Sequence, residues 1–305
     1  MPKALLYISI AFLCQSCFLF TGPTPDPPGT TEEPLPEFLS TPSSFSVERG
    51  KVDEASGMVA SQSMPGNLWV INDGNTKAAL HLLSNTGVYL GSIDLWPSVN
   101  RDWEDMADGP GPEEGVNYLY VGDIGDNAEV YGTYQIYRMK EPGGLVDGIQ
   151  QDVISFRYED RSNGLDVEAM LVDPRTKDIY LISKRQLFTV RVYKLPYPQS
   201  ITEENVAEFQ GVIPHSFITA ADISKDGRQL MIKNYDAIFY WRLSENETVF
   251  EALRRNRDVG LPYYPEEQGE ALCFDYNDSG YYTLSERLDN PTGTLYHYER
   301  KVTDQ

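Results

Sequence analysis

Acidic side chains recur at fixed places in a short motif that this chain repeats. The motif puts acidic or small residues two positions apart, ahead of a hydrophobic residue. Its five copies are Glu54–Met58, Asp102–Met106, Asp166–Met170, Thr219–Ile223 and Gln268–Leu272. Three copies are acidic at the first position and three at the third. In a β-strand, residues two apart lie on the same face, so each motif is expected to present its carboxylates together.

The chemistry that such carboxylates favour is the binding of a hard cation. The predicted metal ligands are Glu54, Asp102, Glu104, Asp123, Asp166, Glu168 and Glu270. The predicted ligand-binding residues are Asp73, Trp103, Lys184 and Glu286, with Lys184 as an internal counter-charge and Trp103 as an aromatic platform. Oxygen-only ligands suit Ca²⁺ before Mg²⁺. The alternative is that these side chains cap turns and bind backbone amides without any metal.

The elements that must position these residues are short strands. About a dozen residues after each motif comes an apolar run such as Leu68–Ile71, and a strand of alternating character such as Tyr134–Met139 follows. Fourth strands are expected at Tyr89–Leu95, Val153–Tyr158, Ala207–Ile213 and Val249–Leu253. Four strands in a repeat of roughly fifty residues predict a β-propeller. Five blades are expected, with six as the alternative, and Ser44–Glu48 would complete the last blade.

The net charge of −21 argues against nucleic acid and against anionic lipid surfaces as partners. Trp69, Trp96, Trp103 and Trp241 lie in or near predicted strands and are expected in the core, with a ligand platform as the alternative for Trp103. Cys273 is also expected in the core. The chain contains no G-x-S-x-G, P-loop or H-E-x-x-H motif. A monomer is expected, and the composition identifies neither a protein partner nor a small-molecule ligand.

The N-terminal sequence indicates export. Lys3 precedes an apolar run, Leu5–Phe20, so residues 1–20 are predicted to be a signal peptide. Cys17 is the candidate for lipidation, which would anchor the protein to a membrane in the cell envelope; the alternative is cleavage and secretion. Residues 21–44 are rich in Pro, Thr and Glu and are expected to form a tether, leaving 45–305 as a single domain.

Several segments carry a family resemblance, namely Glu54–Gly57, Ile71–Gly74, Asn100–Met106, Gly122–Asn127 and Glu267–Ala271. In them the chain resembles a widespread, largely uncharacterised family of exported bacterial propeller proteins and lipoproteins. It is more distantly similar to phytase-like esterase and calcium-dependent apyrase propellers. The resemblance implies a propeller fold and an exported location. From the distant relatives it also implies Ca²⁺ bound by acidic residues around the channel.

Three functions are compatible with the sequence. The first is a cell-envelope binding or scaffold propeller with Ca²⁺ in its channel. The second is a metal-dependent phosphoesterase of phytase or nucleotidase type, which would need cations beside the carboxylates. The candidates for that role are Arg101, Lys184, Arg185, Lys233 and Arg287. The third is a glycosidase that uses Glu104, Glu168 and Glu270.

Overall fold

The computed structural model describes residues 34–161, 163–287 and 293–302. The chain divides into two units, Met1–Pro34 and Leu35–Gln305. All described strands lie in the second unit. The predicted signal peptide and Cys17 lie outside the described residues. No helix in the described segments has the length and apolar character needed to cross a membrane.

The unit Leu35–Gln305 is all-β apart from one short helix in its described part. One sheet contains, in spatial order, β2 (Ala55–Ala60), β3 (Asn67–Asn72), β4 (Ala79–Ser84) and β5 (Tyr89–Asp94). A second has β14 (Ile218–Ile223), β15 (Gln229–Asn234), β16 (Ile238–Arg242) and β17 (Val259–Leu261). A third has β18 (Gln268–Phe274), β19 (Gly280–Glu286), β20 (Gly293–Glu299) and β1 (Ser43–Val47).

The remaining described sheet has eight strands and consists of two antiparallel groups joined edge to edge. The first group is β6 (Trp103–Pro110), β7 (Asn117–Asp123), β8 (Tyr134–Lys140) and β9 (Asp152–Tyr158). The second is β10 (Val167–Val172), β11 (Ile179–Ser183), β12 (Val190–Leu195) and β13 (Asn205–Ile213). The join is a short parallel pairing between β9 and β13, from Phe156↔Asn205 to Tyr158↔Ala207.

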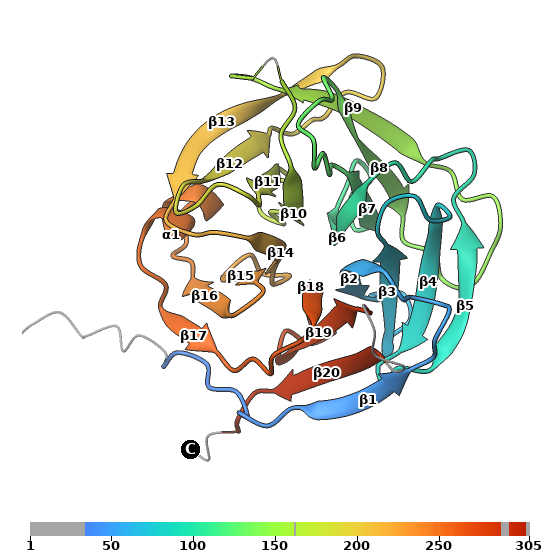
Figure 1. Ribbon diagram of the computed structural model, residues 1–305, viewed down its shortest axis with the longest axis vertical. Coiled ribbons are helices and arrows are strands. Elements are labelled where there is room, and N and C mark those ends of the chain that lie inside the picture. Colours follow the sequence, from blue (N-terminus) through green and yellow to red (C-terminus); the bar gives the residue numbers. More distant parts are fainter. Residues whose placement is uncertain (1–33, 162, 288–292, 303–305) are drawn as a thin grey trace, which may run out of the picture. The chain divides into compact units, whose positions relative to one another are not determined.

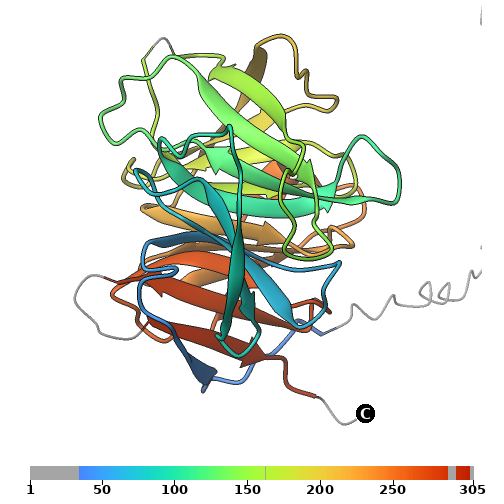
Figure 2. The same cartoon turned by 90° about the vertical axis from the view of Figure 1, so that its right-hand side faces the viewer.

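The sheets are arranged as a ring, which is the propeller-like all-β fold that the repeats predict (Figure 1). The strands β2, β6, β10, β14 and β18 lie innermost, and each contacts the next, with β18 returning to β2. Figure 2 shows the ring from its edge, where the strands run between two faces and the loops project from both. The inner strands therefore line a central channel, and residues from different sheets can meet there.

Apolar side chains fill the spaces between neighbouring sheets. Trp69, Trp103 and Tyr137 belong to one such layer, between β2–β5 and β6–β8. Trp69, Trp103 and Trp241 are fully buried. The expectation that Trp96 is also a core residue is wrong, because its side chain is 83% exposed. Trp96 follows β5 in the loop that leads to β6, beyond the layer in which the two sheets pack.

The ring closes through both ends of the second unit. β1 pairs antiparallel with β20, from Ser43↔His297 to Val47↔Gly293, as expected for an N-terminal strand that completes the last sheet. Further upstream, Phe38 is 4% exposed and packs edge-on against Tyr281, with ring centroids 5.0 Å apart. The domain thus begins at Leu35 and not at Phe45, and the predicted tether, residues 21–44, is too long at its C-terminal end.

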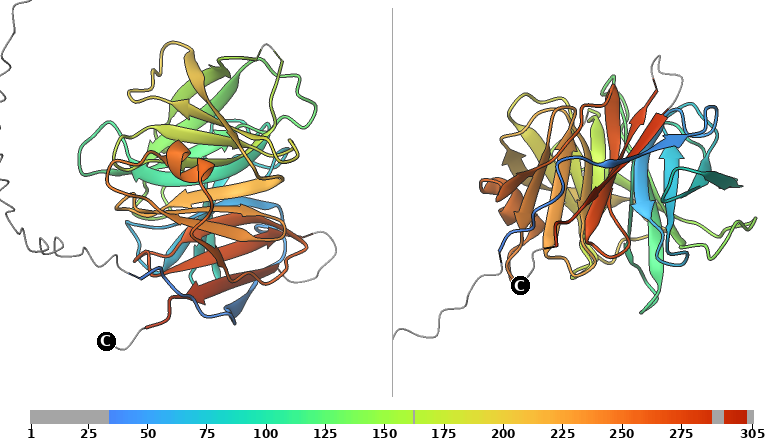
Figure 3. Two further views of the ribbon diagram at one scale, coloured as in Figure 1. Left: turned by 90° about the vertical axis from the view of Figure 1, so that its left-hand side faces the viewer. Right: turned by 90° about the horizontal axis from the view of Figure 1, so that it is seen from below.

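The strand expected at Val249–Leu253 is instead the helix α1 (Val249–Arg254). Thr248 caps it, and Glu251 completes a capping box by accepting from the Thr248 backbone N–H. The helix buries Val249, Ala252 and Leu253 next to β13 and β16, at the periphery of the ring (Figure 3). The fourth strand of this sheet is the three-residue β17. The Thr-x-x-Glu sequence is the signal that favoured a helix.

Candidate functional site

Every inner strand has a β-bulge at the same place. The residues that the pairing skips are Ser56, Glu104, Glu168, Thr219 and Glu270. A bulge leaves one residue out of the ladder and changes the direction of its side chain. Glu104, Glu168 and Glu270 come from three different inner strands. Burial raises the pKa of Glu104 most, and the charges of Glu168 and Glu270 raise it further. The bulges therefore aim the glutamates into the common channel.

The position of the bulge in β14 shows that the fourth motif was aligned two residues too late. Thr219 was placed at the first position of its motif, but the bulge puts it at the third, where other copies have Glu. The Thr219 hydroxyl donates to the Gly269 carbonyl at 3.3 Å, and the Ser56 hydroxyl donates to the Trp103 carbonyl at 2.9 Å. Both hydroxyls thus bind the backbone of the next inner strand. Two of the inner strands contribute a hydroxyl here where the other three contribute a carboxylate.

Asp73, Asp102 and Glu104 bring one carboxylate oxygen each within 4.8 Å of one another. Glu104 is 4% exposed, and no described residue donates a hydrogen bond or forms an ion pair to the carboxylate of either Asp102 or Glu104. Among the described residues, the Asp73 carboxylate accepts a hydrogen bond only from the neighbouring Gly74 N–H. Burial, followed by the charges of Asp73 and Asp166, raises the pKa of Asp102 to about 6. Burial also raises the pKa of Glu104 well above its usual range.

Two glycines shape the walls of this group. A Cβ on Gly125 would collide with Glu104 Oε1 and lie 2.7 Å from Asp102 Cγ. A Cβ on Gly74 would lie 2.6 Å from Asp102 Oδ1. Gly125 is held in place because its N–H donates to the Asp102 carbonyl at 3.1 Å. The loops after β3 and β7 can therefore approach the carboxylates this closely only because Gly74 and Gly125 have no side chain.

The acidic residues on the other side of the channel are neutralised by basic ones. Lys184 Nζ lies 2.5 Å from Glu168 Oε2 and 3.4 Å from Glu270 Oε1. Arg185 pairs with Asp166, and the Tyr235 hydroxyl donates to Glu270 at 2.8 Å. Burial opposes the charge of Lys184, but Glu168 and Glu270 raise its pKa above the usual value. Glu104, Asp166 and Glu168 also form a compact group, yet two of its three members have a cationic partner.

The remaining predicted site residues belong to neither of the two compact carboxylate groups. Glu54 is exposed, and Asp123 accepts from the Asp102 N–H at 2.9 Å and lies 3.8 Å from Arg101 Nε. Glu286 accepts from Gln268, and burial followed by the charge of Glu270 raises its pKa to about 10. The core position expected for Trp103 is confirmed, and the alternative, a ligand platform, is wrong. Its side chain is fully buried and packs on Tyr137, with ring centroids 5.8 Å apart.

The cations proposed for phosphate binding are all engaged within the protein. Besides Lys184 and Arg185, Arg101 stacks over Tyr131 at 4.1 Å from the ring centroid. Lys233 is fully buried, 3.8 Å from a Glu266 oxygen. Arg287 pairs with Asp53 at 2.9 Å. The residue types that a phosphoesterase needs are present near the channel, but their charges are already balanced.

Asp105 follows Glu104 in β6, and the site residues predicted from the sequence did not include it. Its side chain is fully buried and accepts three backbone N–H groups, from Met106 at 2.8 Å, Met170 at 2.9 Å and Ala221 at 3.4 Å. Those residues lie on β6, β10 and β14, so the carboxylate links three inner strands. Its place in the Asp102–Met106 motif was the available signal.

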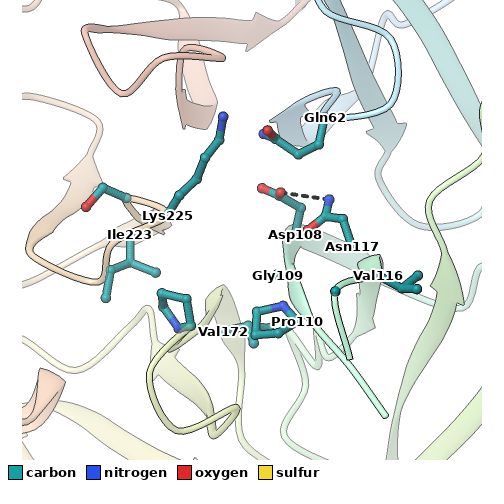
Figure 4. A pocket seen from close by; sticks show the side chains of 12 residues that line it. Gln62, Asp108, Gly109, Pro110, Val116, Asn117, Val172, Ile223 and Lys225 are labelled. Carbon is teal, nitrogen blue, oxygen red and sulfur yellow. Dashed lines mark hydrogen bonds between the residues drawn. The ribbon is translucent and has the colours of Figure 1, made fainter. Parts of the chain in front are cut away.

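A cavity of about 400 Å³ lies at the opposite ends of the inner strands. Asp108, near the end of β6, and Lys225, just after β14, both reach its opening (Figure 4). Asp108 accepts from Asn117 Nδ2 at 3.0 Å, and burial raises its pKa to about 7. This cavity thus lies at the ends of the inner strands, whereas the unpaired carboxylates lie at their starts.

No family model and no curated protein matches this chain. Among solved structures, Kuenenia stuttgartiensis hydrazine synthase is similar, with a TM-score of 0.41 and 12% sequence identity. The match covers 82% of this chain and 72% of that chain. Function is therefore inferred from the side chains of the site.

Proposed function

We propose that this chain is a cell-envelope binding propeller whose channel mouth is organised by a Ca²⁺ ion held by Asp73, Asp102 and Glu104. One observation carries the proposal: Asp102 and Glu104 lie side by side, Glu104 is 4% exposed, and no described donor reaches either carboxylate. A buried carboxylate without a donor or counter-ion is strongly destabilising unless it is protonated or binds a cation. Elsewhere in the channel the same problem is relieved by Lys184 and Arg185.

The ligand geometry favours Ca²⁺ over other ions. Ca²⁺ binds oxygens at about 2.3–2.6 Å, so ligands on opposite sides of it are roughly 5 Å apart. The three carboxylate oxygens lie within 4.8 Å of one another, which matches that span. Mg²⁺ needs shorter bonds in strict octahedral geometry, whereas Ca²⁺ tolerates irregular sets completed by water. The group contains neither His nor Cys, which disfavours transition metals.

Five blades are part of the proposal. Each inner strand of the described ring begins a group of four hydrogen-bonded strands, and the eight-stranded sheet divides into two such groups at the β9–β13 join. The cyclic contacts of β2, β6, β10, β14 and β18 support the same division. Export to the envelope, with lipidation at Cys17, is supported by the apolar run Leu5–Phe20.

Thermal unfolding with and without Ca²⁺ tests the function. Ca²⁺ at a hundred times its Kd should stabilise the native protein by about 2.7 kcal/mol, which corresponds to a rise in Tm of about 5 °C or more. Asp102→Asn and Glu104→Gln should abolish the rise, and Mg²⁺ at the same concentration should give a smaller one.

The matched control is Asp147→Asn, because Asp147 is an exposed carboxylate in the loop between β8 and β9 and belongs to neither compact carboxylate group. This variant should keep the full response to Ca²⁺. A rise in Tm that survives both channel substitutions would place the ion elsewhere and overturn the proposal.

A further inference from the structure

The most exposed tryptophan of this chain stands beside a groove. The groove has a volume of about 730 Å³ and lies between the β5–β6 loop, the end of β7, β8 and the segment leading into β9. Trp96 is 83% exposed and Val99 is 67% exposed, and both line it. Tryptophan is usually well buried, so an exposed indole next to a hollow marks a surface that a ligand or partner covers.

The other wall of the groove is polar and has unused hydrogen-bonding groups. Gln135 Oε1 accepts from the Tyr137 hydroxyl at 2.8 Å, while the Gln135 side-chain NH₂ donates to no described residue. Gln150 is exposed and makes no side-chain hydrogen bond with the described residues. The Arg101 guanidinium donates to the Thr133 and Asp123 carbonyls at 3.2 and 3.4 Å and lies beside the Asp123 carboxylate.

We propose that this groove binds a neutral oligosaccharide. A flat indole packs against the apolar C–H face of a pyranose ring, and the amides of Gln135 and Gln150 suit the hydroxyl groups at its edge. Arg101 and Asp123 cancel each other's charge, so the groove offers no net charge to an ionic ligand. The net charge of −21 repels anionic polysaccharides. The expected rings are of the glucose or N-acetylglucosamine type, in which equatorial hydroxyls leave a flat C–H face.

Collisional quenching of tryptophan fluorescence by acrylamide tests this directly. The chain has four tryptophans, and Trp69, Trp103 and Trp241 are fully buried, so the quenchable signal comes from Trp96. Cellohexaose or chitohexaose at saturation should protect Trp96 and lower the quenching constant about twofold or more. Calorimetry should then show that Trp96→Ala weakens the binding of that glycan about tenfold, the equivalent of about 1.4 kcal/mol.

Two variants complete the test. Phe188→Ala removes another exposed aromatic, 73% exposed on a different loop, and should leave glycan affinity unchanged. Gln150→Ala should weaken binding without affecting the fold. Binding should persist in EDTA, so a failure of the Ca²⁺ proposal and a failure of this one are distinguishable. Equal affinity in Trp96→Ala, absence of binding by both glycans, or a dimer that shields Trp96 without glycan would each overturn the inference.

Discussion

The residues Asp102 and Glu104 show how a folded chain can hold a carboxylate in an unfavourable place. An Asp in an unfolded chain has a pKa of about 3.9. Burial and the neighbouring charges of Asp73 and Asp166 raise the pKa of Asp102 to about 6 in the folded chain. The folded protein therefore binds a proton at Asp102 more tightly than the unfolded protein does, and a cation would have to displace that proton.

The pH dependence of stability follows with a definite sign. A carboxyl whose folded pKa is raised contributes stability that is present below pH ~4 and is lost as the pH rises through about 6. Without divalent cations, the free energy of unfolding should fall between pH 4 and 7. Asp102→Asn should reduce that fall and raise metal-free stability at pH 7.5, although it abolishes the response to Ca²⁺. Urea unfolding across this pH range checks it, and a pH profile identical to that of Asp147→Asn would contradict it.

At the scale of elements, the loop after β7 determines whether a cation can fit. Gly125→Ala would drive a methyl group into the Asp102 and Glu104 carboxylates. We expect Ca²⁺ affinity to fall about tenfold or more, and stability to fall by about 1–3 kcal/mol because the site is overpacked. Calorimetric titration with Ca²⁺ measures the first effect and urea unfolding the second.

Gly132→Ala is the matched control for that substitution. A Cβ at Gly132 would have no atom within 4 Å, and like Gly125 this glycine has no positive φ. It should therefore leave both quantities unchanged. Unaltered Ca²⁺ affinity in Gly125→Ala would mean that the ion does not bind between Asp102 and Glu104.

At the scale of the whole molecule, the residues before β1 are part of the ring. Phe38 packs on Tyr281, so Phe38→Ala should reduce the free energy of unfolding by about 3–5 kcal/mol. Leu39→Ala changes the next residue, which is 42% exposed, and should change stability by less than about 0.5 kcal/mol. Urea unfolding of the two variants compares them. Equal effects of the two substitutions would mean that residues 37–44 belong to the tether that the composition predicts and not to the ring.

The sequence predicts the ring because its strands are local features. Alternation, turn residues and a regular repeat need no knowledge of distant contacts. The fourth motif was misaligned because a bulge changes pairing without changing composition, and Trp96 was expected in the core although its side chain is exposed. Trp96 lies just after β5 and Trp103 begins β6, and only the packing of one sheet on the next decides which of them is covered. Phe38 escaped prediction since its partners lie more than two hundred residues away.

The join between β9 and β13 has a mechanical consequence. It is a ladder of backbone hydrogen bonds, and no other two four-strand groups of the described strands are joined into one sheet. Under mechanical load or on heating, the ring should open at one of the other boundaries between four-strand groups. Strands β6 to β13 should then separate from the rest as a single rigid unit. Asp102 and Glu104 both belong to that eight-strand unit, while Asp73 follows β3 in the neighbouring sheet. An ion bound to all three would cross-link the sheet β2–β5 to the eight-stranded sheet, at a boundary where no backbone ladder joins the described strands.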